Sequence, residues 1–240
     1  MRYAVIADVH GNFHALEAVL TDINEQGADV ILCLGDVVGY AAMPEQCMRT
    51  VREKCARVVA GNHDHGVVEK IDSTYFNADA RDALYWTAEQ LSEDDLAWLE
   101  ALPLTAEFED VLLVHSTLYF PEYFSYIRTL YDAALAFSKM EQRIGFIGHS
   151  HVPIAFVNSD PIDYFLLAEF QVPEHGRLIV NVGSVGQPRD LDPRACYVLL
   201  DTERNTVYFR RVEYDIAAAA EAIMSCDLPA TNARRLLLGR

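Results

Sequence analysis

The sequence predicts an α/β fold, and two observations lead to this class. In the first third of the chain, short apolar runs alternate with segments of helical periodicity, a pattern that favours parallel strands with helices on both faces of the sheet. Further along the chain, a second series of strand-like runs follows. No internal repeat, low-complexity linker or second domain boundary interrupts the chain, so we expect residues 1–240 to form one domain.

Three strands and two helices are expected in the first third. The strands are short apolar runs: YAVIA at 3–7, VILCL at 30–34 and ARVVA at 56–60. A helix is indicated by apolar residues at helical spacing, namely Leu16, Val19, Leu20 and Ile23. Gly27 ends this helix, and a second helix begins near Pro44.

Helices replace this alternation after Asp64, and we expect a helical insertion at about residues 65–104. Residues 77–91 and 92–102 are predicted as two helices. Ser92 is the expected N-cap of the second helix, because acidic residues fill the turn that follows it. The segment 117–141 is rich in aromatic residues and is expected to end as a helix.

The second half of the chain returns to strands. The expected strands are apolar runs at 111–115, 144–149, 153–157, 177–181, 195–201 and 206–214. From Ile216 the pattern is helical, so residues 216–240 are predicted to form a C-terminal helical tail. Its last residues, RRLLLGR, indicate an amphipathic packing helix and not a membrane anchor.

Composition and charge exclude several classes of protein. With 19 basic and 36 acidic residues, the net charge of -17 repels nucleic acids and anionic membranes, so we expect neither as a partner. Polar residues appear by position 8, too early for a signal peptide, and no apolar run is long enough to span a membrane. The five cysteines form no Cys-x-x-Cys pair, which fits reduced thiols and a cytoplasmic protein.

Polar clusters follow five of the apolar runs. They are Asp8-Val9-His10-Gly11-Asn12, Gly35-Asp36, Gly61-Asn62-His63-Asp64, His115 and Gly148-His149-Ser150-His151. In open α/β sheets, sites form beyond the carboxyl ends of the strands, so we expect these side chains to converge. Asp8 and His10 stand at i, i+2, as do His149 and His151, and on an extended backbone each pair projects to one side.

The residue types in these clusters favour transition metals. Two carboxylates, one amide oxygen and four imidazoles suit Mn²⁺, Fe or Zn²⁺ better than Ca²⁺ or Mg²⁺. They are too many for one tetrahedral ion, but they fit two ions that share a bridging carboxylate. Taken singly, each cluster is a weak signal, and Asp8 or Asn62 alone fits a helix N-cap. The alternative for the whole set is scattered caps, turns and core histidines.

In this order the clusters resemble the motif series of the calcineurin-like metallophosphoesterases. That series is Asp-x-His, Gly-Asp, Gly-Asn-His-Asp/Glu, a lone His and Gly-His-x-His, and the resemblance covers roughly residues 1–215. It implies a four-layer α/β/β/α sandwich. The stretch NVGSVGQPRDLDPRA (181–195) is similar to a loop of the small bacterial and archaeal, phosphodiesterase-like members, which usually carry proline where Val182 stands.

The resemblance also implies roles for these residues. The implied ligands of one metal are Asp8, His10 and His151, those of the other are Asn62, His115 and His149, and Asp36 bridges the two. The implied cofactors are two divalent transition metal ions, Mn²⁺ first, with Fe, Zn or Ni as alternatives. A hydroxide that bridges them would attack phosphorus. His63 is the implied general acid at the leaving group, and support of the ligands is its alternative role.

One departure from part of this family bears on His63. Protein phosphatases and symmetrical dinucleotide tetraphosphatases carry Gly-Asp-x-x-Asp-Arg, whereas Gly39 and Tyr40 stand at the last two positions here. The Asp orients the leaving-group His in those relatives, and the Arg grips phosphate. We therefore do not expect a protein phosphatase, and Asp64 is the candidate for orienting His63.

The expected substrate is a small phosphodiester or a nucleotide polyphosphate, including asymmetric cleavage of dinucleotide polyphosphates. Five aromatic residues follow His115 closely: Tyr119, Phe120, Tyr123, Phe124 and Tyr126. They could stack on a nucleobase, and the alternative is that they pack in the core or at a subunit contact. Arg189 is expected to contact phosphate unless it pairs with Asp190 or Asp192. Asn12 is the other candidate for substrate contact, and its alternative role is to stabilise the turn after the first strand.

A different class of function stays open, that of a non-catalytic metal-binding scaffold for protein interaction. Metal ligands are expected to be replaced in such scaffolds, whereas every ligand position is filled here. Association into a homo-oligomer also stays open. Among the remaining histidines, His14 and His65 are expected to be solvated or structural, and His175 is expected to lie in a hairpin.

Overall fold

The computed structural model describes the whole chain, residues 1–240. Its elements, with η for a 3₁₀ helix, are β1 (Arg2–Ile6), α1 (Phe13–Glu25), β2 (Val30–Cys33), α2 (Pro44–Lys54), β3 (Arg57–Val58), α3 (Asn62–Val67), η1 (Ser73–Tyr75), α4 (Ala78–Gln90), α5 (Glu93–Ala101), β4 (Thr105–Phe108), β5 (Val111–Val114), η2 (Pro121–Tyr123), α6 (Leu130–Phe137), β6 (Ile144–Ile147), β7 (Ile154–Val157), β8 (Asp163–Phe165), β9 (Glu169–Gln171), β10 (Leu178–Asn181), β11 (Ala195–Asp201), β12 (Thr206–Val212), α7 (Ile216–Met224) and α8 (Ala230–Leu238).

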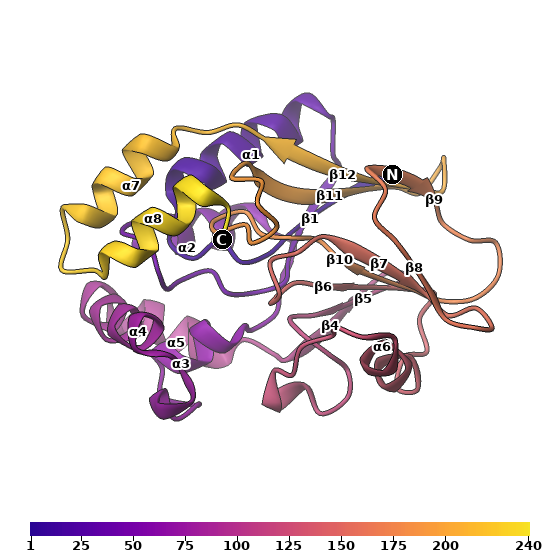
Figure 1. Cartoon of the computed structure of the whole chain (residues 1–240), viewed down its shortest axis with the longest axis horizontal. Coiled ribbons are helices and arrows are strands. Elements are labelled where there is room, and N and C mark those ends of the chain that lie inside the picture. The colour runs from indigo at the N-terminus through magenta and orange to yellow at the C-terminus, as the bar shows by residue number, and fades with distance from the viewer.

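The strands form two six-stranded sheets that pack face to face. One sheet has the order β3-β2-β1-β11-β12-β9, and the other has the order β4-β5-β6-β10-β7-β8. Helices α1 and α2 cover the outer face of the first sheet, and α6 covers the outer face of the second (Figure 1). The layers run helix, sheet, sheet, helix, which confirms the predicted α/β/β/α sandwich.

The strands that precede the polar clusters run parallel to one another within each sheet. β1 pairs with β2, and β2 with β3, in parallel; β5 pairs with β6, and β6 with β10, in the same way. All other pairings are antiparallel, including that of β1 with β11, so both sheets are mixed. Because parallel strands end at one edge of a sheet, the loops after β1, β2, β5 and β6 meet at a common edge.

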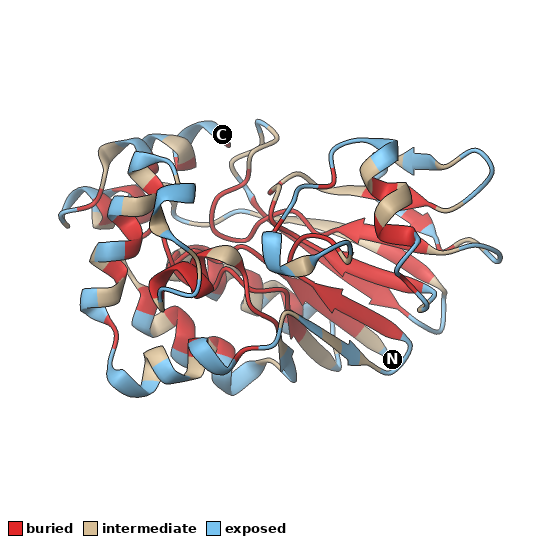
Figure 2. Cartoon of the chain, turned by 90° about the horizontal axis from the view of Figure 1, so that it is seen from below, coloured by how far each residue is buried: buried red, intermediate tan, exposed pale blue.

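Alternate residues of the strands divide between two cores. Ala4 and Ile6 of β1 pack under α1 and α2, whereas Tyr3 and Val5 pack between the two sheets. Burial on both faces explains why these strands are continuous apolar runs. Figure 2 shows the buried residues concentrated along the strands, with exposed residues on the outer sides of the helices.

Two groups of helices flank the edge at which the strand ends meet. The segment expected as an insertion contains the second half of α3, then η1, α4 and α5, and its Val67, Leu84 and Leu99 join the core of α1 and α2. In the tail, α7 and α8 pack on each other and against Ala83 of α4. Ser92 caps α5 as predicted, because its Oγ accepts a hydrogen bond from the Asp95 amide at 3.2 Å. No helix combines the length and the apolar character that a membrane crossing requires.

Besides the 3₁₀ helices η1 and η2, four elements lie outside the sequence predictions: α3, β4, β8 and β9. β4 has the sequence TAEF and alternates exposed with half-buried residues at a sheet edge, so it lacks the apolar run by which the other strands were identified. The predicted strand at 56–60 shortens to the two residues of β3. α3 begins at Asn62, and this helix therefore carries part of a polar cluster that the sequence places in a loop.

Candidate metal centre

The loops after β1 and β2 are held together by their backbones. The amide of Asp8 donates to the Gly35 carbonyl at 3.0 Å, and the amide of His10 donates to the Asp36 carbonyl at 2.9 Å. The Asp8 carboxylate in turn accepts from the amide of His149, at 3.0 and 3.2 Å, which ties in the loop after β6. The convergence expected from the strand ends is therefore present.

Five of the expected metal ligands adopt a left-handed backbone. The φ angles are +54° at Asp8, +52° at His10, +49° at Asp36, +64° at His149 and +59° at His151. Non-glycine residues rarely adopt such angles, which cost of order 1–3 kcal/mol each and cluster at functional sites. The extended backbone assumed for the two i, i+2 pairs is wrong, because both pairs lie just past the last ladder hydrogen bond of their strand.

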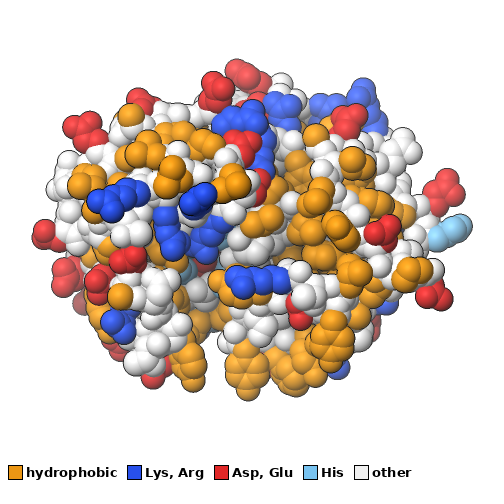
Figure 3. All heavy atoms as spheres, in the orientation of Figure 1, with side chains coloured by type: hydrophobic (Ala, Val, Ile, Leu, Met, Phe, Trp, Pro, Cys, Tyr) orange, Lys and Arg blue, Asp and Glu red, His pale blue; other side chains and the backbone are white.

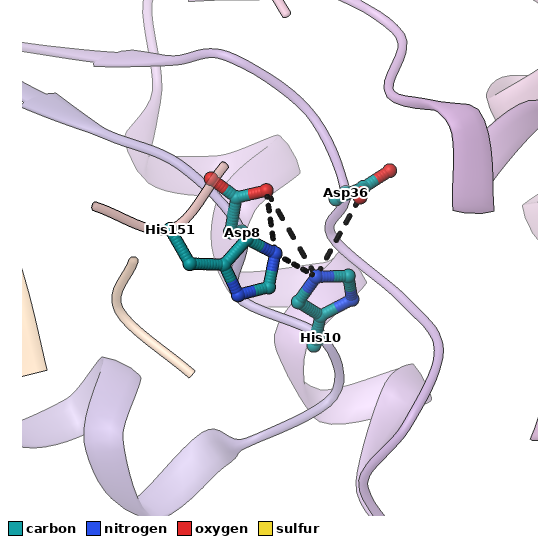
Figure 4. A group of neighbouring side chains, drawn as sticks. All are labelled: Asp8, His10, Asp36 and His151. Carbon is teal, nitrogen blue, oxygen red and sulfur yellow. Dashed lines mark hydrogen bonds and ion pairs between the residues drawn. The ribbon is translucent and has the colours of Figure 1, made fainter. Parts of the chain in front are cut away.

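A first group of possible ligands consists of Asp8, His10, Asp36 and His151, each of which offers an atom within 4.8 Å of the others (Figure 4). His151 Nε2 lies 3.2 Å from Asp8 Oδ1, and His10 Nε2 lies 3.5 Å from Asp36 Oδ2. All four side chains are fully buried. A buried set of carboxylates and imidazoles with converging lone pairs is the environment of a divalent cation.

A second group consists of Asp36, His115 and His149. His115 Nε2 lies 3.3 Å from Asp36 Oδ2 and 3.2 Å from His149 Nδ1. Asp36 thus belongs to both groups, and its other oxygen accepts from the His63 amide at 2.8 Å. One carboxylate shared between two ligand groups is the arrangement that a pair of bridged cations requires.

Backbone carbonyls fix the orientation of three of these imidazoles. Nδ1 of His10 lies 3.2 Å from the Val38 oxygen, Nδ1 of His115 lies 2.8 Å from the Leu34 oxygen, and Nδ1 of His151 lies 2.6 Å from the Gln187 oxygen. A carbonyl can only accept, so each Nδ1 carries the proton. Each Nε2 is therefore directed to the centre.

Burial and the shared carboxylate set the charges. Burial lowers the pKa of His10, His149 and His151, which keeps these rings in the neutral form that binds metals. Burial acts in the same direction on His115, but the Asp36 carboxylate outweighs it and raises the pKa of His115 to about 9. Burial would raise the pKa of Asp36, yet attraction by His115 and its neighbours holds that pKa well below its usual range. A buried carboxylate that stays ionised attracts a cation.

Asn62 and His63, the first residues of α3, both line the cleft that contains Asp36. Asn62 Oδ1 is buried without a hydrogen-bond partner and lines the cleft that opens on Asp36, which is what an oxygen ligand awaiting a cation would do. His63 Nδ1 is also buried and unpartnered. Burial lowers the pKa of the His63 ring to about 4. Taken together, the donors fit divalent metal binding.

Packing, and not Asp64, orients the His63 ring. The ring lies 4.7 Å from that of His10, 4.5 Å from that of Tyr40 and 5.2 Å from that of Phe76. The Asp64 carboxylate instead accepts from the backbone amides of residues 37, 38 and 61, so the role expected for it is wrong. Those amides surround Asp64, which therefore shapes the loop of Asp36.

Gly39 makes room for His63. A Cβ atom at this position would lie 2.5 Å from His63 Nδ1. The glycine that replaces the Asp of the protein-phosphatase motif thus lets the imidazole pack directly against the backbone.

The loop after β10 supports the centre, and the sequence analysis did not assign this role. Asn181 Nδ2 donates to the Gly148 carbonyl at 2.6 Å, and Ser184 Oγ donates to the Asp8 carbonyl at 2.8 Å. A Cβ atom on Gly186 would lie 1.9 Å from the Val9 oxygen, so only glycine fits there. The signal for this role is the stretch NVGSVGQPRD, whose small and amide residues permit a close backbone approach.

The two expected substrate contacts have different surroundings. Asn12 caps α1 by accepting from the Ala15 amide at 3.1 Å, and its Nδ2 donates to the Gly186 carbonyl at 2.9 Å. Its amide is thus used within the chain, so we do not retain it as a substrate contact. Arg189 lines the cleft and donates to Gln187 Oε1 at 2.8 and 3.3 Å. It pairs with neither Asp190 nor Asp192, because both of these bind Arg211.

A cleft of about 590 Å³ opens on the centre and runs between two walls. The insertion provides one wall: Lys70, Ile71, Asp72, Tyr75, Phe76, Asn77 and Ala80. The η2 loop, which we define as residues 119–126, provides the other: Glu122, Tyr123, Phe124 and Tyr126. In the space-filling view, hydrophobic side chains gather on both sides of a hollow at the lower edge, with Lys and Arg side chains at its upper end (Figure 3). Of the remaining histidines, His65 is buried in α3, which is the structural one of the two roles expected for it. His175 is exposed between β9 and β10, which belong to different sheets, so the hairpin expected there is wrong.

Comparison with known proteins identifies relatives of the whole chain. Residues 1–205 match the model of the calcineurin-like phosphoesterase superfamily domain. An uncharacterised protein of Methanocaldococcus jannaschii is 38% identical over 243 residues, which cover 99% of this chain and 98% of the relative.

Solved structures agree with this result. A metallophosphoesterase from Sphaerobacter thermophilus is 37% identical, with a TM-score of 0.89 over 100% of this chain and 99% of that one. A hypothetical protein from Pyrococcus horikoshii has the same fold, with a TM-score of 0.80 at 20% identity over 100% of this chain and 98% of that one.

Proposed function

The chain belongs to the calcineurin-like phosphoesterase superfamily, and we propose that it is a di-metal hydrolase of a small phosphodiester or nucleotide polyphosphate. The observation that supports this most directly is the sharing of Asp36 between two ligand groups. Of the divalent ions that suit such ligands, we propose Mn²⁺ as the first candidate. When bound, two such ions polarise the phosphate and lower the pKa of a water molecule toward neutrality.

In this proposal, the ligands hold a fixed geometry before substrate arrives. The left-handed backbones, the carbonyl-bound imidazoles and the loop after β10 all restrict movement of the centre. Such preorganisation lowers the barrier because nothing has to reorient during the reaction. His63 lies beside the ligands, at the inner end of the cleft, and would assist departure of the leaving-group oxygen.

Arg189 is the residue that we propose grips the phosphate. Its guanidinium has no carboxylate partner, and Gln187 Oε1 occupies only part of its donor capacity. The group lies 5.6 Å from the centre of the Tyr40 ring, and Tyr40 stands where protein phosphatases carry their own Arg. Arg189 would therefore supply the positive charge from a different loop.

The proposal is tested with purified protein loaded with Mn²⁺, on bis(4-nitrophenyl) phosphate, 4-nitrophenyl phosphate and diadenosine tetraphosphate. We expect turnover of the diester or of the dinucleotide, and loss of both turnover and bound metal in Asp36→Asn. The matched control is Asp82→Asn, which changes an exposed carboxylate of α4 outside the cleft and should leave both unchanged.

Each result has a distinct meaning. ATP plus AMP from the dinucleotide would indicate asymmetric cleavage, whereas diester turnover alone would indicate a phosphodiesterase. If two metals bind and no phosphoryl compound is cleaved, the hydrolase proposal fails and the scaffold function replaces it. Full turnover by Asp36→Asn would refute the bridging role of this residue.

A further inference from the structure

Two exposed tyrosines lie in the cleft beyond the metal centre. Tyr75, in η1, is 85% exposed, and Tyr123, in η2, is 73% exposed. Each belongs to a different wall of the cleft, one to the insertion and one to the η2 loop. Large aromatic side chains at such exposure cover no core. Because these two line the cleft, their rings are available to a molecule that enters it.

The η2 loop is held rigidly against the metal ligands. The Phe124 ring packs edge-on against that of His115, with 5.9 Å between the ring centres. Tyr126 stacks on His149 at 4.1 Å with an interplanar angle of 19°. Phe120 and Phe124 bracket η2 with left-handed backbones, at φ +54° and +48°. The loop thus has a fixed position relative to the centre, and Tyr123 lies on an ordered wall of the cleft.

Charge changes sign along the cleft. Arg189 lies at the inner end, where its amide donates to the His151 carbonyl at 3.2 Å. The outer walls carry two carboxylates, Asp72 and Glu122, and one ammonium, that of Lys70, which donates to the Glu100 carbonyl, so the charge of these walls is net negative. A phosphate is favoured at the inner end, while further phosphates are disfavoured between Asp72 and Glu122. The outer cleft therefore suits a flat, uncharged group with hydrogen-bonding edges.

We propose that Tyr75 and Tyr123 form a subsite for the base of a nucleoside that is esterified to the phosphate at the metal centre. The substrate class is then a nucleoside phosphodiester and not a long polyphosphate chain. This inference rests on the proposed function, because it assumes a phosphate bound at the centre. A tyrosine ring can stack on any base. Asn77, Asp72 and Glu122 would supply polar contacts to the edge of the base or to the sugar.

The test uses two inhibitors of bis(4-nitrophenyl) phosphate hydrolysis by the Mn²⁺-loaded protein: thymidine 5′-monophosphate and methyl phosphate. Both carry the same phosphate, and only one carries a nucleoside. We expect the inhibition constant of the nucleotide to be lower by roughly tenfold or more, as stacking of one base provides. Tyr75→Ala and Tyr123→Ala should each raise the constant of the nucleotide several-fold and leave that of methyl phosphate unchanged. Tyr131→Ala is the matched control, because Tyr131 is 71% exposed on α6 outside the cleft.

Failure of the inference differs from failure of the proposed function. Equal inhibition constants for the two compounds, in a protein that hydrolyses the diester, would overturn the nucleoside subsite alone. The same holds if neither tyrosine variant weakens binding of the nucleotide. No hydrolysis of any phosphoryl compound by protein with two bound metals would overturn the proposed function, and the subsite with it.

Discussion

The Nε2 atoms of His10 and His151 face each other at 3.1 Å in the interior of the protein. Both rings donate from Nδ1 to backbone carbonyls, so both neutral rings direct a lone pair into the same space. Two facing lone pairs repel, and a cation between them removes the repulsion. The fold therefore holds this pair in a geometry that is complementary to a bound metal ion.

We expect metal binding to stabilise the fold through this pair. Adding Mn²⁺ to metal-stripped protein should raise the melting temperature, because a ligand at about 100 times its dissociation constant contributes about 2.7 kcal/mol. In His151→Ala the rise should be smaller, and metal analysis should find one ion per chain in place of two. His175→Ala, which changes an exposed residue, is the control. An undiminished stabilisation in His151→Ala would remove His151 from the ligand set.

Gly39→Ala is expected to impair catalysis without releasing metal. The new Cβ would lie 2.5 Å from His63 Nδ1, so the imidazole must move away from its position. We expect a loss of roughly 10²-fold in kcat, at the lower end of what a side chain that assists the leaving group provides. Metal content should stay at the wild-type value, because the three atoms nearest to this Cβ all belong to His63 and not to a ligand.

Gly27→Ala separates this effect from backbone strain. Gly27 has a φ of +64° and Gly39 a φ of +97°, so alanine is strained at both positions, but a Cβ at Gly27 meets nothing within 4 Å. The Gly27 variant should lose stability and keep its kcat. Equal losses of kcat in the two variants would show that strain, and not displacement of His63, is responsible.

Tyr126 is expected to support the second metal through His149. The stacked Tyr126 ring restricts His149, and the Arg128 guanidinium lies over the Tyr126 ring, 3.9 Å from its centre. Tyr126→Ala should weaken binding of one metal about 10–100-fold, the range found for residues that orient a ligand. Tyr126→Phe keeps the ring and should restore the affinity, as measured by metal titration. If the Phe variant binds as poorly as the Ala variant, the hydroxyl and not the stacking matters.

The sequence predicts the fold class and the candidate ligands because both depend on local patterns. An apolar run followed by Asp, His or Asn places a polar side chain at a strand end, whatever the detailed backbone. Asp36 and His115, for example, are separated by 79 positions and still meet for this reason. The sheet order, by contrast, follows from pairings such as β1 with β11, which no local pattern encodes.

The contacts around the ligands could not be predicted in the same way. The stack of Tyr126 on His149 and the packing of His63 against Gly39 depend on side-chain positions set by several distant segments. The hydrogen-bond partners of Asp64 are a similar case. Its position next to His63 in the sequence indicates a contact with that ring, whereas in the fold three backbone amides donate to its carboxylate. A buried carboxylate binds the donors that surround it.

Asp22 links α1 to the outer face of the first sheet and should make stability depend on pH. Its carboxylate accepts from Arg210 at 2.7 and 3.1 Å and from the Tyr197 hydroxyl at 2.7 Å. Burial acts to raise the pKa of Asp22, but the hydrogen bonds from Arg210 and Tyr197 outweigh it and lower that pKa. A carboxyl group whose pKa is lower in the folded than in the unfolded state stabilises the fold at pH values above its unfolded-state pKa. This contribution is lost as the pH falls through the folded-state pKa.

Asp22→Asn should therefore lower the free energy of unfolding by about 2 kcal/mol at pH 7, the size expected for hydrogen bonds to a charged group. The difference between wild type and variant should persist down to about pH 4, near the unfolded pKa of Asp, and shrink below it. Urea denaturation of both proteins at a series of pH values measures this difference. Asp82→Asn serves as the control, because that exposed carboxylate forms no ion pair. A difference that stays constant through the acidic range would mean that Asp22 contributes by shape and not by charge.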